Sequence, residues 1–262
     1  MTQAQKVIKY FAYALAIFII ISIFSLVIEI VRGVSGIYIE EDVKNEQIEY
    51  DNYLILDLTK ADLHIKTGDL LKAESDNKNI NIKQDGNKLV VKDKKGLFLN
   101  KNKTVVNITV PENFEFDYVK IDTGAGNINI ERLKSRVLNL DMGAGKLNIN
   151  DITVNKEANV DTGAGEVIIN NAFINKLDLD LGAGKTEFSG IIVGSADIDT
   201  GVGNFVMNLR DRIDNYTFDL NKGIGNILVN GDQISTDSKV SNGSVNIEID
   251  GGIGNIEINT KY

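Results

Sequence analysis

From residue 53 to the end of the chain, apolar and polar residues alternate with a period of two, the pattern of β-strands with one buried face. Leu138 and Leu140 flank a single asparagine, and Leu147 and Ile149 repeat the arrangement beyond a short glycine-containing segment. No stretch after residue 31 has the 3.6-residue period of an amphipathic helix. The pattern therefore predicts an all-β domain in which every second side chain faces a core.

A Gly-x-Gly pair recurs along this domain. The first glycines of successive pairs lie 19, 20, 19, 19 and 22 residues apart. A repeat of about 20 residues with a glycine turn at the same position in each repeat is typical of a solenoid. We therefore predict a parallel β-solenoid, or β-helix, with rungs of about 20 residues. The glycines would form sharp turns in which neighbouring rungs leave no room for a Cβ atom. These structural turn glycines are Gly124, Gly126, Gly143, Gly145, Gly163, Gly165, Gly182, Gly184, Gly201, Gly203, Gly223 and Gly225.

The amino end has a different pattern. No charged residue occurs from Tyr10 to Ile28, and these nineteen residues would span roughly 28 Å as a helix, close to the thickness of a bilayer core. A cleaved signal peptide and a buried core helix are the alternatives, but the run is long and lacks an Ala-x-Ala cleavage pattern. Lys6 and Lys9 precede the run, so the positive-inside rule predicts a cytoplasmic amino terminus and an extracytoplasmic carboxyl-terminal domain.

These patterns predict five segments. A cytoplasmic tail covers residues 1–9, a single transmembrane anchor residues 10–31, and a polar, acidic stalk residues 32–52. Strands that start or cap the solenoid cover residues 53–115, and the glycine-turn solenoid covers residues 116–262. The expected location is the cell membrane, with one pass.

Composition excludes several classes of function. The net charge of −9 repels nucleic-acid phosphates, so we expect no nucleic-acid partner. The chain has no cysteine and one histidine, His64, which rules out thiolate nucleophiles and multi-histidine zinc sites.

The motifs that resemble nucleotide-binding or catalytic sites lack the residues that such sites require. Gly184, Lys185 and Thr186 end like a P-loop, but Leu179 stands where the first glycine is required, so we expect no nucleotide binding. Carboxylate pairs are abundant, which leaves a glycosidase-like site open, yet nothing singles out an acid and a nucleophile. We expect no enzymatic activity and no cofactor.

Residues 61–69, the segment Val110, Pro111 and Glu112, and rungs of the type Thr-Gly-Ala-Gly-Asn-Ile-Asn-Ile together resemble the bacterial putative-adhesin family. This is a β-solenoid domain of unknown function, related to the head-GIN putative adhesins. The resemblance covers residues 53–262 and implies a solenoid on the surface of a bacterium. It also implies a connection of some relatives with envelope-stress regulation, and it brings no catalytic residues.

One polar position repeats with the glycines. An aspartate recurs at intervals of 19 or 20 residues, so stacking predicts a single column of Asp122, Asp141, Asp161, Asp180, Asp199 and Asp219. This prediction treats Asn221 and Lys222 as two extra residues in the last turn. The column could bind cations, since calcium favours carboxylate oxygens, or each aspartate could cap the N–H groups of its own glycine turn. We favour the cap, and expect no resident metal and a slightly lower melting temperature for Asp161→Ala.

The sequence thus favours a non-enzymatic, membrane-anchored surface scaffold for adhesion, with an unknown surface ligand. The alternative is a regulatory partner in an envelope-stress response, which would act through contacts with another membrane protein.

Overall fold

The computed structural model describes residues 51–93, 104–221, 223–234 and 238–261. The predicted tail (1–9), the predicted anchor (10–31) and nearly all of the predicted stalk (32–52) lie outside the described residues. Within the described ranges no helix is long and apolar enough to cross a membrane. The helical structure found there is one 3₁₀ turn, η1 (Ile213–Asn215).

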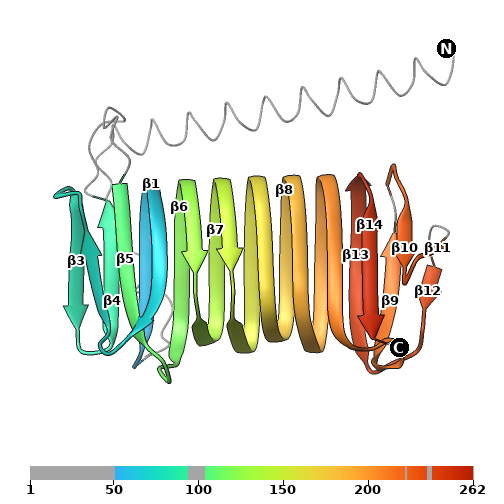
Figure 1. Cartoon of the computed structure of the whole chain (residues 1–262), viewed down its shortest axis with the longest axis horizontal. Coiled ribbons are helices and arrows are strands. Elements are labelled where there is room, and N and C mark those ends of the chain that lie inside the picture. Colours follow the sequence, from blue (N-terminus) through green and yellow to red (C-terminus); the bar gives the residue numbers. More distant parts are fainter. Residues whose placement is uncertain (1–50, 94–103, 222, 235–237, 262) are drawn as a thin grey trace, which may run out of the picture. The chain divides into compact units, whose positions relative to one another are not determined.

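The described chain is otherwise nearly all β, as its alternating pattern predicts (Figure 1). Fourteen strands belong to one sheet that coils on itself. They are β1 (Tyr53–Gly68), β2 (Lys72–Ser75), β3 (Ile80–Asp85), β4 (Lys88–Asp93), β5 (Thr104–Pro111), β6 (Phe116–Ile130), β7 (Leu133–Ile149), β8 (Ile152–Arg212), β9 (Tyr216–Asn221), β10 (Ile227–Val229), β11 (Asp232–Ile234), β12 (Ser238–Val240), β13 (Val245–Ile253) and β14 (Ile256–Lys261).

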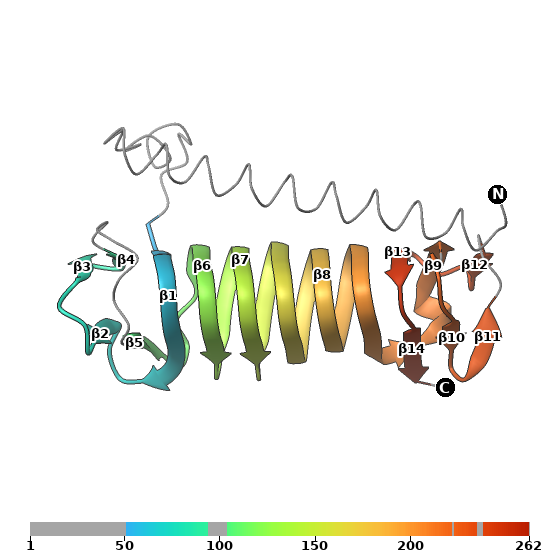
Figure 2. The same ribbon diagram turned by 90° about the horizontal axis from the view of Figure 1, so that it is seen from above.

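The central strands are whole turns of the coil, and each pairs in parallel with the next (Figure 2). The register between β6 and β7 joins Ile121 to Leu140, and that between β7 and β8 joins Leu140 to Val160. Equivalent positions of successive rungs are therefore stacked. Strand β8 is 61 residues long and contains three Gly-x-Gly turns.

The core is the space enclosed by the rungs. Every second residue of a rung points inward, and the aliphatic side chains of neighbouring rungs form continuous buried ladders. Leu138 and Ala158 belong to one such ladder, and Ile149 and Ile169 belong to another. Each fully buried aliphatic side chain stabilises the fold by about 1.5–3 kcal/mol relative to an exposed one, so the repeating ladders hold the coil together.

The order of rungs in the stack differs from their order in the chain at both ends. β13 pairs on one side with β8 and on the other with β9, so the last rung of the chain lies between the β8 rungs and the β9–β10 rung. At the opposite end, β1 lies between β6 on one side and the rung of β4 and β5 on the other. The first and last rungs of the domain are thus each second from an end of the stack.

Short antiparallel strands cover both ends. β3 pairs with β4 and β2 with β5 at one end, while β12 pairs with β9 and β11 with β10 at the other. A parallel edge with unpaired N–H and C=O groups would be a template for aggregation. The four short strands β2, β3, β11 and β12 pair with these edges at the two ends of the stack.

Candidate functional site

The predicted turn glycines lie at one corner of the coil. The second glycine of each pair has a positive φ: Gly126, Gly145, Gly165, Gly184, Gly203 and Gly225 lie between 141° and 153°. A Cβ atom on any of these six glycines would lie 1.6–1.8 Å from a backbone oxygen of the neighbouring rung, which for Gly225 is the oxygen of Gly254. A Cβ on the first glycines, Gly124, Gly143, Gly163, Gly182, Gly201 and Gly223, would meet backbone oxygen at 1.9–2.6 Å. Glycine is required because neighbouring backbones touch at this corner.

Two residues before the first glycine of every turn except that of Gly223, an outward-facing aspartate repeats through the stack. The register joins Asp57 to Asp122, Asp122 to Asp141 and Asp141 to Asp161. Asp180 then lies between Asp161 and Asp199, and Asp199 is paired with Asp250. The first acidic column therefore consists of Asp57, Asp122, Asp141, Asp161, Asp180, Asp199 and Asp250.

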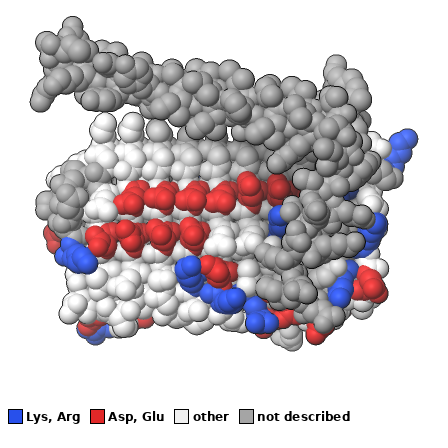
Figure 3. All heavy atoms as spheres, turned by 180° about the vertical axis from the view of Figure 1, so that it is seen from behind, with Lys and Arg blue, Asp and Glu red and all other residues white. Residues whose placement is uncertain are grey.

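A second acidic column lies beside it, on the residues two positions earlier in the same strands. Asp197 is adjacent to Asp178 and paired with Glu248, which is paired with Asp219. The second acidic column consists of Asp178, Asp197, Glu248 and Asp219. Figure 3 shows both columns as adjoining red rows that follow the stack axis, with the second row shorter than the first.

The prediction for Asp219 is wrong, because this residue belongs to the second column. Asn221 is the residue paired with Asp250, and its amide donates to the Asp250 carboxylate at 2.8 Å. Asn221 is therefore not an extra residue of the turn. The longer interval before Gly223 arises earlier, where η1 leads into β9.

The sequence prediction also missed Asp57 and Asp250. Asp250 precedes Gly252 by two residues, the spacing that Asp199 has to Gly201, whereas Asp219 precedes Gly223 by four. That spacing was the available signal for Asp250. Asp57 had no such signal, because its rung has Thr59 and Ala61 where the others have glycine.

Partial desolvation and the crowding of like charges raise the pKa of several carboxylates in these columns. Partial desolvation raises the pKa of Asp180 above its usual value, and the neighbouring Asp161 raises it further. The pKa of Asp199 is raised by desolvation and then by Asp180 and Asp250, and the pKa of Asp178 by desolvation and then by Asp180 and Asp197. Two charges about 4.8 Å apart in water repel by roughly 0.9 kcal/mol, so the fold holds these carboxylates together against repulsion.

For four of the aspartates the favoured cap is not among the described hydrogen bonds. No glycine-turn N–H is seen to donate to Asp141, Asp161, Asp180 or Asp199 there, and the side chain of Asp180 interacts with Asp161 and Asp199 instead. Nor do the described ranges contain a group of three or more histidine or carboxylate side chains arranged to hold a metal ion. The columns are linear arrays of acceptors that face the solvent.

A groove runs along the first column. It is open to solvent, has a volume of about 500 Å³ and crosses four rungs. The carboxylates of Asp141, Asp161, Asp180 and Asp199 border it, and the turn glycines of the same rungs line it. The groove gives a linear ligand room to lie parallel to the stack axis, beside a row of negative charges.

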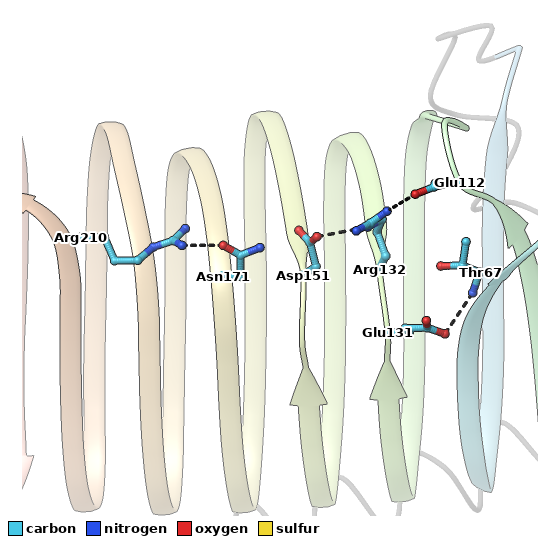
Figure 4. A network of polar contacts seen from close by, with 7 residues as sticks. All are labelled: Thr67, Glu112, Glu131, Arg132, Asp151, Asn171 and Arg210. Carbon is cyan, nitrogen blue, oxygen red and sulfur yellow. Dashed lines mark hydrogen bonds and ion pairs between the residues drawn. The ribbon is translucent and has the colours of Figure 1, made fainter.

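Charged residues elsewhere on the coil have polar or oppositely charged partners. Arg132 donates to Glu112 at 2.9 Å and to Asp151 at 3.1 Å, and Arg210 donates to the side-chain oxygen of Asn171, two rungs away (Figure 4). Exposed pairs of this kind contribute at most about 1 kcal/mol each. In contrast, no ion pair with lysine or arginine is found for Asp141, Asp161, Asp180 or Asp199 among the described contacts, although Lys239 lies 3.4 Å from Asp219.

A coiled parallel sheet with glycine corners and acidic columns defines a repetitive, solenoid-like domain. The Toastrack DUF4097 family model matches residues 41–261, so the chain belongs to this family, whose function is unknown. The match confirms the resemblance to the adhesin-like domains. No curated protein matches the sequence. A solved structure, of a putative cell adhesion protein from Clostridium sporogenes, is 16% identical and covers 80% of this chain and 92% of its own, with a TM-score of 0.34.

Proposed function

We propose that the chain is a non-enzymatic binding scaffold of the bacterial cell surface, with residues 10–31 as its membrane anchor. The acidic columns are its binding surface, and its ligand is a cationic molecule or polymer. The single observation that carries this proposal is the alignment of eleven carboxylates in two adjoining columns on one face.

The backbone makes this surface suited to binding. Each carboxylate of the first acidic column projects from a rung that is hydrogen-bonded to the rungs on both sides, so these charges keep a regular spacing of about 4.8 Å. A fixed array of one sign attracts an oppositely charged ligand from a distance and loses little conformational freedom when the ligand binds. Such an array binds through many weak, salt-sensitive contacts.

Repetition supports binding over catalysis. A carboxylate pair that performs acid–base chemistry needs two different environments, so that one group is protonated while the other is ionised. Asp161, Asp180 and Asp199 occupy equivalent positions in successive rungs, and each has the next as its neighbour. Equivalent groups in a row offer the same contact many times.

The test uses the full chain in zwitterionic nanodiscs and a fluorescent oligolysine of about ten residues as the probe. Asp161→Asn, Asp180→Asn and Asp199→Asn in one variant should weaken binding by about tenfold at low salt and flatten its salt dependence, because three charge contacts are lost. The control variant Asp69→Asn, Asp85→Asn, Asp232→Asn changes the net charge equally at exposed residues away from the columns. Equal weakening in both variants, or no binding by the wild type, would refute the proposal.

A further inference from the structure

An apolar ridge follows the glycine corner. The middle residues of the Gly-x-Gly turns are stacked on one another, since Ala125 is paired with Ala144, Ala144 with Ala164, and Ile253 with both Val202 and Ile224. The ridge is defined by Ala125, Ala144, Ala164, Ala183, Val202, Ile253 and Ile224. Its side chains grow from alanine to valine and isoleucine toward the end of the stack formed by β9 and β10.

The large members of the ridge are exposed. Val202 is 55% exposed, Ile253 41% and Ile224 65%, and they occupy three consecutive rungs. The same side chains could have been alanine, as they are in the four preceding turns, without loss of core packing, because they point away from the core. Three adjacent β-branched side chains facing water need a physical reason, and contact with an apolar partner is one.

The ridge and the first acidic column run parallel, with the groove beside them. Each ridge residue except Ile224 lies three positions after a residue of the first acidic column, as Val202 does after Asp199 and Ile253 after Asp250, whereas Ile224 follows Asn221. Between the two lie the turn residues that line the groove, for example Thr200 and Gly201. Figure 3 shows uncharged surface bordering the longer red row. A ligand lying along the stack therefore meets apolar groups on one side and carboxylates on the other.

We propose that the ridge and the first acidic column together bind a cationic amphipathic helix that lies along the stack axis. The inference rests on the proposed function and narrows its ligand class. Charge complementarity and spacing both favour this partner. Successive turns of a helix are 5.4 Å apart, and successive rungs of the stack are about 4.8 Å apart. Apolar side chains of the helix that are one turn apart would therefore stay within about 1 Å of the ridge residues Val202, Ile253 and Ile224 in register. Same-side residues of an extended peptide are about 6.7 Å apart and lose register sooner.

Other occupants of the ridge agree less well with the neighbouring charges. An anionic lipid surface would be repelled by the first acidic column, and a second copy of the chain would bring its own column toward this one. Association with a second copy is a measurable outcome of the experiment.

The experiment compares three 18-residue peptides on the full chain in zwitterionic nanodiscs. The first is built of leucine and lysine with all leucines on one helical face, the second has the same composition in scrambled order, and the third has serine in place of leucine. Since the chain contains no cysteine, a fluorophore on Asn204→Cys reports binding beside the ridge and excludes signal from lipid-bound peptide. Wild type should bind the amphipathic peptide about tenfold more tightly than the scrambled one.

The decisive variant is Val202→Ser, Ile224→Ser, Ile253→Ser, with Phe173→Ser, Val193→Ser as its control. Phe173 and Val193 are also exposed but lie outside the ridge. The ridge variant should lose the preference for the amphipathic peptide yet keep its binding of the serine peptide, and the control should keep both. Thermal melting verifies that each variant is folded.

Each contrary result overturns the inference in a distinguishable way. If the ridge variant keeps the preference for the amphipathic peptide, or the control variant loses it, the ridge is not part of the binding site. Equal binding of all three peptides to wild type leaves the proposed function standing without this ligand class, and binding of none refutes both. A wild-type dimer that the ridge variant dissociates in sedimentation, without any peptide preference, would assign the ridge to a second copy.

Discussion

At the residue scale, the glycine corner is the position where the fold tolerates least change. A Cβ atom on Gly165 would lie 1.8 Å from the backbone oxygen of Gly145, and its φ of +144° is one that L-residues rarely adopt. Backbone cannot move aside as a flexible side chain can, because Gly145 is itself fixed by the next rung. Strain and a steric clash therefore act together.

We expect Gly165→Ala to destabilise the domain by about 3 kcal/mol or more, measured as the free energy of unfolding in urea. Gly231→Ala is the matched control, since Gly231 has a φ of +87° but nothing within 4 Å of its Cβ position. The control should lose only about 1 kcal/mol, the cost of the dihedral alone. Equal losses in the two variants would show that rung contact is not what requires glycine.

The acidic columns give the stability of the chain a pH dependence. The pKa values of Asp178, Asp180 and Asp199 are raised on folding, mainly by desolvation and then by neighbouring carboxylates. Their stabilising contribution is fully present below the ordinary aspartate pKa of about 3.9 and is lost as pH rises through the folded values. Asp214 and Glu166 have lowered pKa values and act in the opposite direction, but Asp214 is exposed, Glu166 is half-buried, and each forms an ion pair with one cation at the surface.

We therefore expect the melting temperature to rise when pH is lowered at low ionic strength from 7.5 toward the ordinary aspartate pKa of about 3.9. Asp180→Asn should raise the melting temperature at pH 7.5 and flatten the pH dependence, because it removes the central charge of the column. Salt should weaken both effects through screening, and Asp232→Asn should leave them unchanged. A lower melting temperature for Asp180→Asn at pH 7.5 would show that the carboxylate is stabilising, as the predicted cap required.

At the scale of elements, the sequence specifies the rung but not its place in the stack. Alternation and glycine spacing correctly predict inward positions such as Leu138, Leu140 and Phe188, because the side-chain period of a strand is fixed. The rungs containing Gly223 and Gly252 carry the same signals, so periodicity cannot tell which of them stacks on Gly201. The placement of Asp219 failed for a different reason, because the extra residues before Gly223 lie where η1 leads into β9 and not in the glycine turn.

This reversed order predicts an unusual pattern of local stability. In native-state hydrogen exchange, we expect the amides of β13 and β14 to be better protected than those of β9 and β10, although they lie nearer the chain end. The reason is that β13 has a rung on both sides, whereas β9 is covered on one side by only the three-residue strand β12. Strand β7, in the middle of the stack, gives the reference protection. Early exchange of β14, as in an ordinary fraying terminus, would contradict the stacking order.

At the scale of the whole molecule, the stack is a nearly one-dimensional array in which each rung contacts only its neighbours. Stability in such an array is a sum of rung and interface contributions, and length changes in whole units. The acidic columns and the ridge share this property, since every added rung extends them by one residue. The length of the binding surface is thus coupled to the number of rungs.

This coupling can be tested by deletion. Removing residues 144–163 takes out one complete rung and joins Gly143 to Ala164, which restores the Gly-x-Gly turn and every ladder. Removing residues 154–163 takes out half a rung and places the following strand on the wrong side of the coil, so its apolar side chains face water. We expect the first deletion to keep the β-type circular dichroism spectrum and a cooperative melt while the particle shortens by about 4.8 Å, and the second to lose cooperative melting. Similar melting of the two deletions would mean that the rung is not the unit of this fold.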